Sequence, residues 1–399
     1  MLQPPSLKLL GRYNAGQCDS TSELWQVLVR RGWWLWAQCP GLGVVRLRQL
    51  QQLATASEVD LEALWHWPLP KLSASLAWPQ GVLLAVDRHR RSCAARQTLA
   101  IPDQVILPMD DSWPEGFRRL ERPPLMTFWQ GDQALLPLLS AGEAVAVVGS
   151  RRASRHALQA AELLGRALAR AGWPVVSGLA EGVDASAHKG CLAVGGQPVA
   201  VLGTPLNRAY PAEHLNLQAR VAQQGLLLSE LSPGARVQRS SFARRNRLLV
   251  AIARHVVVVE CPEGSGALLT AEAAVRQGRS LSVMPADALR LTARGSNRLL
   301  REGAQPLLDP ESWVAGLGMG PLATPSGVLT TPENNGVSAR ANPLEHHDSA
   351  LLALLDDGAS LPQLAHALQR SSVALAEDLV QLELEGVVVA EPGMRWRLA

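Results

Sequence analysis

Short apolar runs alternate with helical segments through the middle of the chain. Ala144–Val148 is continuously apolar, ends in Gly149-Ser150 and precedes a helical stretch from about Arg155 to Ala171. Near-uniform apolar strands indicate a parallel sheet that is covered on both faces. Alternation with helices therefore predicts an extended Rossmann-like, doubly wound α/β fold with a mainly parallel sheet. The further strands are expected at 175–178, 198–203, 226–230, 255–260, 281–285 and near 306, and the further helices at 184–194, 212–224, 242–254, 267–277 and 296–302.

The same pattern divides the chain into four parts. Residues 1–80 read as a small helical N-terminal domain, similar to a SAM or helix-hairpin-helix module, with tryptophans at 25, 33, 34 and 36. Residues 81–315 form the predicted Rossmann-like core, and 316–345 are a Gly-, Pro-, Thr-, Ser- and Asn-rich linker. Residues 346–399 fit a winged helix. In the first part, Gly41-Leu42-Gly43 has the form of a helix-hairpin-helix turn that offers backbone N–H groups to a phosphate, although the pattern favours a plain tight turn between helices.

The predicted winged helix has an acidic third helix. Helices are expected at 348–356, 361–368 and 373–385, and strands Val387–Ala390 and Arg395–Leu398 flank a turn. From Val373 to Met394 there are several acidic residues and no basic one. A helix that reads duplex DNA presents basic and amide side chains to phosphates and base edges. We therefore interpret the tail as a protein-contact module, in which only the arginines of the last strand could touch nucleic acid.

Composition excludes several classes of protein. No stretch approaches the roughly 18–20 apolar residues of a membrane span, and the N-terminus lacks the apolar region of a secretory signal. Five cysteines form no CxxC pair, which disfavours a disulfide framework or a zinc site and predicts a cytoplasmic location. The adjacent pair His346-His347 lies in the predicted linker, where a solvated pair is expected rather than a metal site.

Net charge is only +3, but arginine greatly outnumbers lysine among the basic residues. Three lysines stand among 38 basic residues, and the rest are arginine, whose planar group binds phosphates and carboxylates in a bidentate way. Genomic base composition alone could produce this bias. The position of the arginines is therefore more informative than their number.

Ligands of open parallel sheets bind at the carboxyl ends of the strands. The chain has no G-x-G-x-x-G after the first strand and no GxxxxGK[ST], which disfavours a dinucleotide dehydrogenase and a P-loop ATPase. Instead, the first strand is followed by Gly149-Ser150-Arg151-Arg152-Ala153-Ser154-Arg155. Three arginines at the opening of a helix suit an anion.

The segment between Glu230 and Glu260 is rich in arginine and contains no acidic residue. Phe242 stands among these arginines, and a single-stranded nucleic acid needs this combination of cations for phosphates and a ring for a base. A solvated helix face with one buried phenylalanine is the alternative. We expect Glu230 and Glu260 to pair with arginines rather than act as an acid–base pair. The arginines are Arg236, Arg239, Arg244, Arg245, Arg247 and Arg254.

Residues 144–308 resemble the DNA-processing protein A (DprA, or Smf) family. The resemblance covers ordered blocks through some 160 residues, and the preceding segment Pro108–Gly131 resembles the extension before the sheet in this family. The blocks are Val148–Arg151, Val176–Asp184 with Ala187–Gly190, Ala200–Thr204, Tyr210-Pro211, Leu228–Glu230, Phe242–Arg247, Gly264–Gly266 with Thr270-Ala271, and Asn297–Ala304.

The resemblance implies a non-enzymatic protein, commonly a homodimer, that binds single-stranded DNA and loads the RecA recombinase during natural transformation. It implies no cofactor, no metal and no catalytic residue. It also implies a DNA pocket lined by the residues that match the family's motifs. These are Gly149, Ser150, Arg151, Arg239, Phe242, Arg244, Arg245 and Asn246, with Lys189, Ser265 and Gly266 at the rim.

Departures from the family pattern affect loops. Pro205 and Ala286 replace usual glycines, and Ala243 replaces a common proline, which changes the backbone freedom of these loops. Two other functions stay open. Pro262–Glu272 partly resembles the P-G-G-x-G-T-x-x-E motif of Lonely Guy phosphoribohydrolases, and this function would make the chain a nucleotide-cleaving enzyme. The second alternative is that the winged tail regulates transcription by binding duplex DNA.

Overall fold

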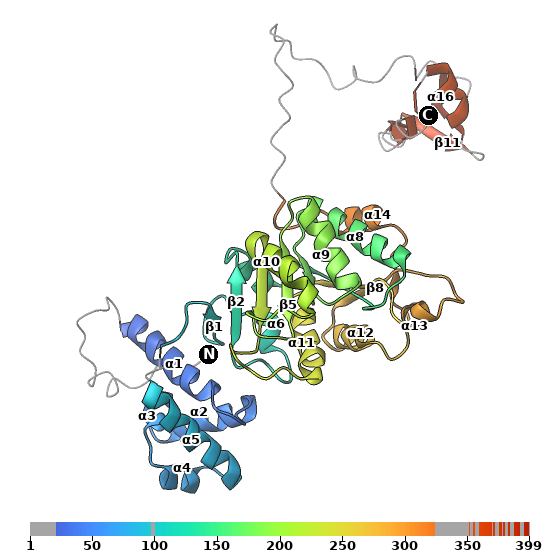
Figure 1. Cartoon of the computed structure of the whole chain (residues 1–399). Coiled ribbons are helices and arrows are strands. Elements are labelled where there is room, and N and C mark those ends of the chain that lie inside the picture. Colours follow the sequence, from blue (N-terminus) through green and yellow to red (C-terminus); the bar gives the residue numbers. More distant parts are fainter. Residues whose placement is uncertain are drawn as a thin grey trace. The chain divides into compact units, whose positions relative to one another are not determined.

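The computed structural model describes residues 21–96 and 100–323, together with part of 351–398. It divides into two compact units, Met1–Gly327 and Val328–Ala399 (Figure 1). The first unit holds the sheet and a group of N-terminal helices, and the second holds the C-terminal segment. Among the described residues, no helix combines the length and the hydropathy that crossing a bilayer requires.

A nine-stranded sheet forms the centre of the first unit, as the alternating pattern predicted. Its strand order is β1-β2-β6-β5-β4-β3-β7-β8-β9, and all neighbours from β6 to β9 are parallel, whereas β1 and β2 add an antiparallel edge. The chain runs outward from β3 to β6 and then returns to the other side of β3 as β7. The strand order therefore switches between β3 and β7, where doubly wound folds bind their ligands. The strands are β1 (Val105–Ile106), β2 (Thr127–Gly131), β3 (Val145–Val148), β4 (Val175–Ser177), β5 (Pro198–Leu202), β6 (Leu226–Ser229), β7 (His255–Val258), β8 (Ser280–Val283) and β9 (Gln305–Pro306).

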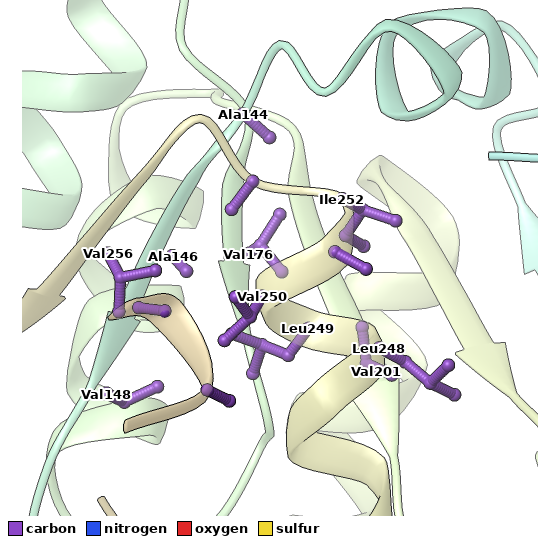
Figure 2. Close-up of a cluster of buried hydrophobic side chains, with 14 of the residues drawn as sticks. Ala144, Ala146, Val148, Val176, Val201, Leu248, Leu249, Val250, Ile252 and Val256 are labelled. Atoms are coloured by element: carbon purple, nitrogen blue, oxygen red, sulfur yellow. The ribbon is translucent and has the colours of Figure 1, made fainter. Parts of the chain in front are cut away.

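Helices cover both faces of the sheet because alternate residues of each strand point to opposite faces. Ala146 and Val148 of β3 pack in one apolar cluster with α7, α11 and α12, and Val145 and Val147 pack in another with α8, α9 and α14. Figure 2 shows the first cluster, where Leu248, Leu249 and Val250 at the end of α11, and Ile252 just after it, lie against the strands. The helices are α6 (Glu115–Arg118), α7 (Leu135–Ala141), α8 (Arg155–Arg170), α9 (Val183–Ala193), α10 (Leu215–Gln224), α11 (Arg239–Ala251), α12 (Gly266–Arg276), α13 (Arg294–Arg301) and α14 (Pro310–Leu317).

Helix α11 begins three residues earlier than the sequence pattern predicted. Gln238 and Ser241 form a capping box, in which each side chain pairs with the backbone of the other. Such boxes satisfy N–H groups that a helix start would otherwise leave unpaired. The shift places Arg239 on the first turn of the helix instead of in the preceding loop.

The N-terminal helices enclose a tryptophan-rich core. Trp33, Trp34 and Trp36 are buried, and the Trp36 indole donates to the Leu61 carbonyl at 2.7 Å and meets the Trp65 ring edge-on at 5.1 Å. The helices are α1 (Thr21–Ala37), α2 (Val44–Ala56), α3 (Leu61–Trp65), α4 (Leu69–Ser75) and α5 (Gln80–Arg96).

The boundary that we predicted at residue 80 lies inside this helical region. Helix α5 contributes Leu83 and Val86 to the tryptophan-rich cluster, which also includes Val105 and Phe128 from the sheet edge. The helical region therefore extends to Arg96 and shares its core with β1 and β2. Because of this shared cluster, helices and sheet form one compact unit.

The C-terminal unit contains a small antiparallel sheet of order β10-β12-β11. Strands β11 (Val388–Glu391) and β12 (Arg395–Leu398) form the predicted hairpin, with Val388 opposite Leu398, beside β10 (Ala359–Ser360) and α16 (Leu361–Leu368). Trp396 packs in its core. The helices predicted at 348–356 and 373–385 fall largely outside the described residues, as does the predicted linker from residue 324 onward.

Candidate nucleic-acid interface

A pocket of about 450 Å³ opens at the carboxyl ends of β3 and β7, at the switch in strand order. The loop after β3, the first half of α11 and the start of α12 form its walls. All but two of the predicted site residues line it. Those that line it are Gly149, Ser150, Arg151, Arg239, Phe242, Arg245, Asn246, Ser265 and Gly266.

The loop after β3 is held tightly against β7. A Cβ atom on Gly149 would lie 2.6 Å from a Val183 methyl group and 2.9 Å from the Glu260 carbonyl oxygen, so only glycine fits there. The Ser150 N–H donates to that same carbonyl at 2.7 Å, and its hydroxyl accepts from the Arg152 N–H at 3.0 Å. The loop is therefore closed on itself, and it leaves Arg151 exposed at the pocket.

Arg151 and Phe242 form the rim of the pocket. The Arg151 guanidinium carbon lies 5.4 Å from the centroid of the Phe242 ring, within cation–π range. The half-buried ring is supported from another side by Tyr210, with centroids 4.9 Å apart. In the described part of the chain, no carboxylate lies within 4.0 Å of the charged groups of Arg151 or Arg239. The rim therefore presents positive charge next to an aromatic face, and the buried Asp184 carboxylate acts on Arg151 only from beyond ion-pair distance, as the lowering of the Asp184 pKa by the Arg151 charge shows.

Arg245 forms the inner wall of the pocket and is almost fully buried, with 4% of its surface exposed. Its guanidinium donates to the carbonyls of Gly178, at 2.7 Å, and of Val201. Burial lowers the pKa of Arg245 to about 10, and the charge of Asp184 opposes that shift. We grouped Arg245 with the cations that meet phosphate, but its hydrogen-bonding capacity is spent largely within the protein.

Asp184 and His188 lie on α9 next to the same wall, and Asp184 itself lines the pocket. The Asp184 carboxylate accepts from the Gly178 N–H at 3.1 Å, and burial raises its pKa while the Arg245 charge lowers it. His188 is fully buried beside the Val199 carbonyl, at 3.3 Å from Nε2, and burial lowers its pKa to about 4. The inner wall is thus a buried polar network, whereas the rim is solvent-facing.

Two predicted residues lie away from the pocket. Lys189 is exposed on α9 and does not line it. Arg244 lies on α11 but turns to the opposite side, where it meets Glu230 at 3.4 Å. The acid-free stretch of sequence therefore supplies cations to two different surfaces.

The carboxylates near the site have structural partners. Glu230 pairs with Arg244 and with Arg247, the latter at 2.5 Å, and Glu260 accepts from the Ser154 N–H at 2.8 Å and from its hydroxyl at 2.7 Å. Glu230 thus has the arginine partners that we expected, whereas Glu260 is held by Ser154 and pairs at 3.9 Å with Arg290, which lies outside the acid-free stretch. Glu272 ends the segment that partly resembles the phosphoribohydrolase motif. It is exposed, pairs with Arg276 and does not line the pocket.

The pocket lining also contains residues outside the predicted set. Asp184 and Thr270 line the pocket but were not predicted as site residues, and neither was Arg152, although it is one of the three arginines that suit an anion. Asp184 and Thr270 lie in the blocks that carry the family resemblance, so a signal was present. In the part of the chain that the structure describes, no cluster of three or more His, Cys, Asp or Glu side chains could hold a metal ion.

A rim of arginines without a carboxylate within 4.0 Å in the described structure, around an aromatic ring at the switch point of a doubly wound sheet, defines an α/β protein with a pocket suited to an anion. The model of the DNA recombination-mediator protein A family matches residues 104–318, and the chain belongs to this family.

Individual relatives extend the match beyond the core. Protein Smf of Synechocystis is 29% identical over 92% of this chain and 98% of its own length. The DNA processing protein DprA of Streptococcus pneumoniae is 34% identical over 52% of this chain and 72% of its own. The crystal structure of the pneumococcal protein superposes with a TM-score of 0.60 at 26% identity, covering 71% of this chain and 97% of that one. The similarity thus includes the fold as well as the sequence.

Proposed function

We propose that the protein binds single-stranded DNA in this pocket and acts as a recombination mediator. The observation that carries the proposal is the pair of Arg151 and Phe242, with Arg239 in the same lining and no carboxylate within 4.0 Å of either guanidinium in the described structure. Cations that follow phosphates and a ring that stacks on a base are the two components of single-strand binding. Sequence preference should be weak, because every base has a stacking face.

The position of the ring favours single strands over duplexes. Phe242 is half-buried inside a pocket of about 450 Å³. A base can enter such a pocket only when it is unstacked and unpaired, which costs little in a single strand and a few kcal/mol in a duplex. We therefore expect duplex DNA to bind through phosphates alone.

Membership of the recombination-mediator family supports the finer part of the proposal. We propose that the protein works in the cytoplasm as a homodimer without catalytic activity, protects incoming single-stranded DNA and loads RecA onto it. Natural transformation and general homologous recombination both supply such a substrate. Asp184 is the carboxylate among the described residues that line the pocket, and it accepts from the Gly178 and Ala180 N–H groups. A carboxylate held in this way argues against the nucleotide-cleaving alternative.

Fluorescence anisotropy with labelled oligonucleotides of equal length tests the binding step. We expect preference for single strands and a slope of log K on log salt of about −0.7 per neutralised phosphate. Equal affinity for duplex, or no binding, would overturn the proposal. Release of free base from nucleoside monophosphates would replace it with the enzymatic function.

RecA filament assembly on oligonucleotides coated with a single-strand binding protein tests the loading step. We expect the full chain to shorten the lag before RecA hydrolyses ATP, and light scattering to give twice the chain mass. An unchanged lag would leave a DNA-binding protein that does not load RecA.

A further inference from the structure

A second, larger groove of about 830 Å³ lies between the N-terminal helices and the sheet region. Helix α2, the loop before β2 and the outer side of α11 contribute to it. Four arginines from these three segments line the groove, and Glu230 is the only carboxylate among its lining residues. We refer to this surface as the arginine groove. Its arginines are Arg46, Arg122, Arg244 and Arg247.

The single carboxylate leaves most of this charge uncompensated. Glu230 accepts from Arg247 at 2.5 Å and from Arg244 at 3.4 Å, so one negative charge is shared by two cations. Arg122 is exposed, and no carboxylate of the described residues lies within 4.0 Å of it. Arg46 donates to the Gly41 carbonyl, which is neutral. A concave surface with surplus charge of one sign concentrates ligands of the opposite sign.

Helix α11 joins the arginine groove to the pocket. Arg239, Phe242 and Asn246 line the pocket, whereas Arg244 and Arg247 line the groove. Successive residues turn by about 100° around a helix, so the two sets lie on different sides of α11, and the neighbours Asn246 and Arg247 are about 100° apart. A helix with its side chains is about 10–12 Å wide. A DNA strand that leaves the pocket can therefore reach the groove within a few nucleotides.

The groove offers phosphate contacts without a stacking platform. Trp78 is the only aromatic residue in its lining, and 8% of its surface is exposed. Its indole N–H is donated to the Gln49 side chain at 2.6 Å, which fixes the ring in the wall. A base has no open ring to stack on in this groove, and the guanidinium groups are the recognition elements.

We propose that the arginine groove binds the sugar–phosphate backbone of the same strand whose bases enter the pocket, and so lengthens the DNA site onto the N-terminal helices. The inference rests on the proposed function of the pocket. It gives the Gly41-Leu42-Gly43 turn a place in the site, since Leu42 and Gly43 line the groove. The helical N-terminal region thereby becomes part of the DNA-binding surface.

The test compares short and long oligothymidylates on the full chain. A length of about 5 nucleotides occupies the pocket, and about 20 nucleotides extends past the upper range for one binding module. The double variant Arg46→Gln/Arg122→Gln removes two groove cations without touching the pocket. Arg48→Gln is the matched control, because Arg48 is exposed on the same helix but does not line the groove.

We expect the double variant to bind the short oligonucleotide like the parent. On the long one, its slope of log K on log salt should fall by about 0.7 for each lost phosphate contact, or about 1.4 in all. The Arg48→Gln control should keep the parent slope at both lengths.

The outcomes separate the groove from the pocket. A double variant that matches the parent on the long oligonucleotide overturns the groove proposal and leaves the pocket function intact, and the groove would then suit an acidic protein partner. Equal losses at both lengths also overturn it, because the groove would not be a separate part of the site. If the parent binds neither length, the proposed function itself fails.

Discussion

The inner wall and the rim of the pocket use the same residue type in opposite environments. Arg245 of the wall is buried, donates to two backbone carbonyls and faces Asp184. Arg151 of the rim is exposed and lies over the Phe242 ring without a carboxylate partner in the described structure. Burying a charge is costly unless it is paired and hydrogen-bonded. The wall arginine therefore serves the fold, and the rim arginine is available to a ligand.

This difference shows that a basic stretch of sequence does not define a basic surface. Arg239, Arg244 and Arg245 follow one another closely, yet they lie in the pocket rim, in the arginine groove and in the wall respectively. Each therefore affects a different measurement when it is replaced.

The largest expected effect comes from Arg245→Ala. The change removes the donor to the Gly178 and Val201 carbonyls and the positive charge that acts on the buried Asp184 carboxylate. A buried acceptor left without its donor typically costs about 1–3 kcal/mol, and two carbonyls are affected, so we expect a loss of about 2–6 kcal/mol. Urea unfolding followed by circular dichroism measures the loss.

Arg151→Ala is the matched comparison for stability. Its side chain is exposed, so the free energy of unfolding should change by no more than about 0.5 kcal/mol. Equal midpoints for both variants would contradict the distinction between wall and rim.

The pH dependence of stability tests the same wall through His188. Burial holds the pKa of His188 at about 4, below the 6.5 of an exposed histidine. Because the unfolded chain binds this proton more tightly, the stabilisation is fully present above pH 6.5 and is lost as the pH falls toward 4. A difference of this size amounts to about 3 kcal/mol. Urea unfolding between pH 7 and pH 4 measures it.

His188→Gln should flatten this pH dependence, because the titrating group is gone. His156→Gln is the control, since His156 is exposed at the start of α8. If the parent and the His188→Gln variant had the same pH profile, another group would cause the loss of stability at acidic pH.

Much of the fold followed from apolar runs, because strands buried on both faces must be apolar throughout. Val145–Val148 and His255–Val258 pair in parallel as the alternation predicted. The beginning of α11 was misplaced because a capping box between Gln238 and Ser241, rather than apolar periodicity, starts the helix. The predicted boundary at residue 80 coincides with the start of α5, and the tryptophan-rich core continues past it into α5 and the sheet edge.

The sequence could predict which residues gather at the pocket, but not whether each of them would be buried in its wall or exposed at its rim. Arg245 precedes Leu248, Leu249 and Ile252 by three, four and seven positions, which is the spacing of one helix face. All three are buried in the main core, so periodicity alone could have placed Arg245 inside. Arg239 lines the pocket and Arg244 lines the arginine groove because different elements pack on each side of α11. Tertiary structure decides which elements these are.

Phe242→Ala tests the rim without changing its charge. We expect single-stranded DNA to bind with about 1–3 kcal/mol less free energy, since a stacked base contributes about that much. The salt slope should stay the same, because no cation is removed. Anisotropy titrations at several salt concentrations give both quantities.

Phe242→Leu separates stacking from space filling. Leucine keeps an apolar side chain against Tyr210 but has no aromatic face. The prediction would be wrong if Phe242→Leu bound DNA as tightly as the parent.

The smallest expected effect is in the salt dependence of Arg151→Gln. Loss of one phosphate contact should reduce the slope of log K on log salt by about 0.7, so a fourfold rise in salt weakens binding about threefold less than in the parent. Arg276→Gln, on α12 outside the pocket, should keep the parent slope. An Arg151→Gln slope equal to that of the parent would mean that the exposed rim arginine, like the buried Arg245, makes no contact with phosphate. The comparison between rim and wall would then reduce to a difference in burial without a difference in function.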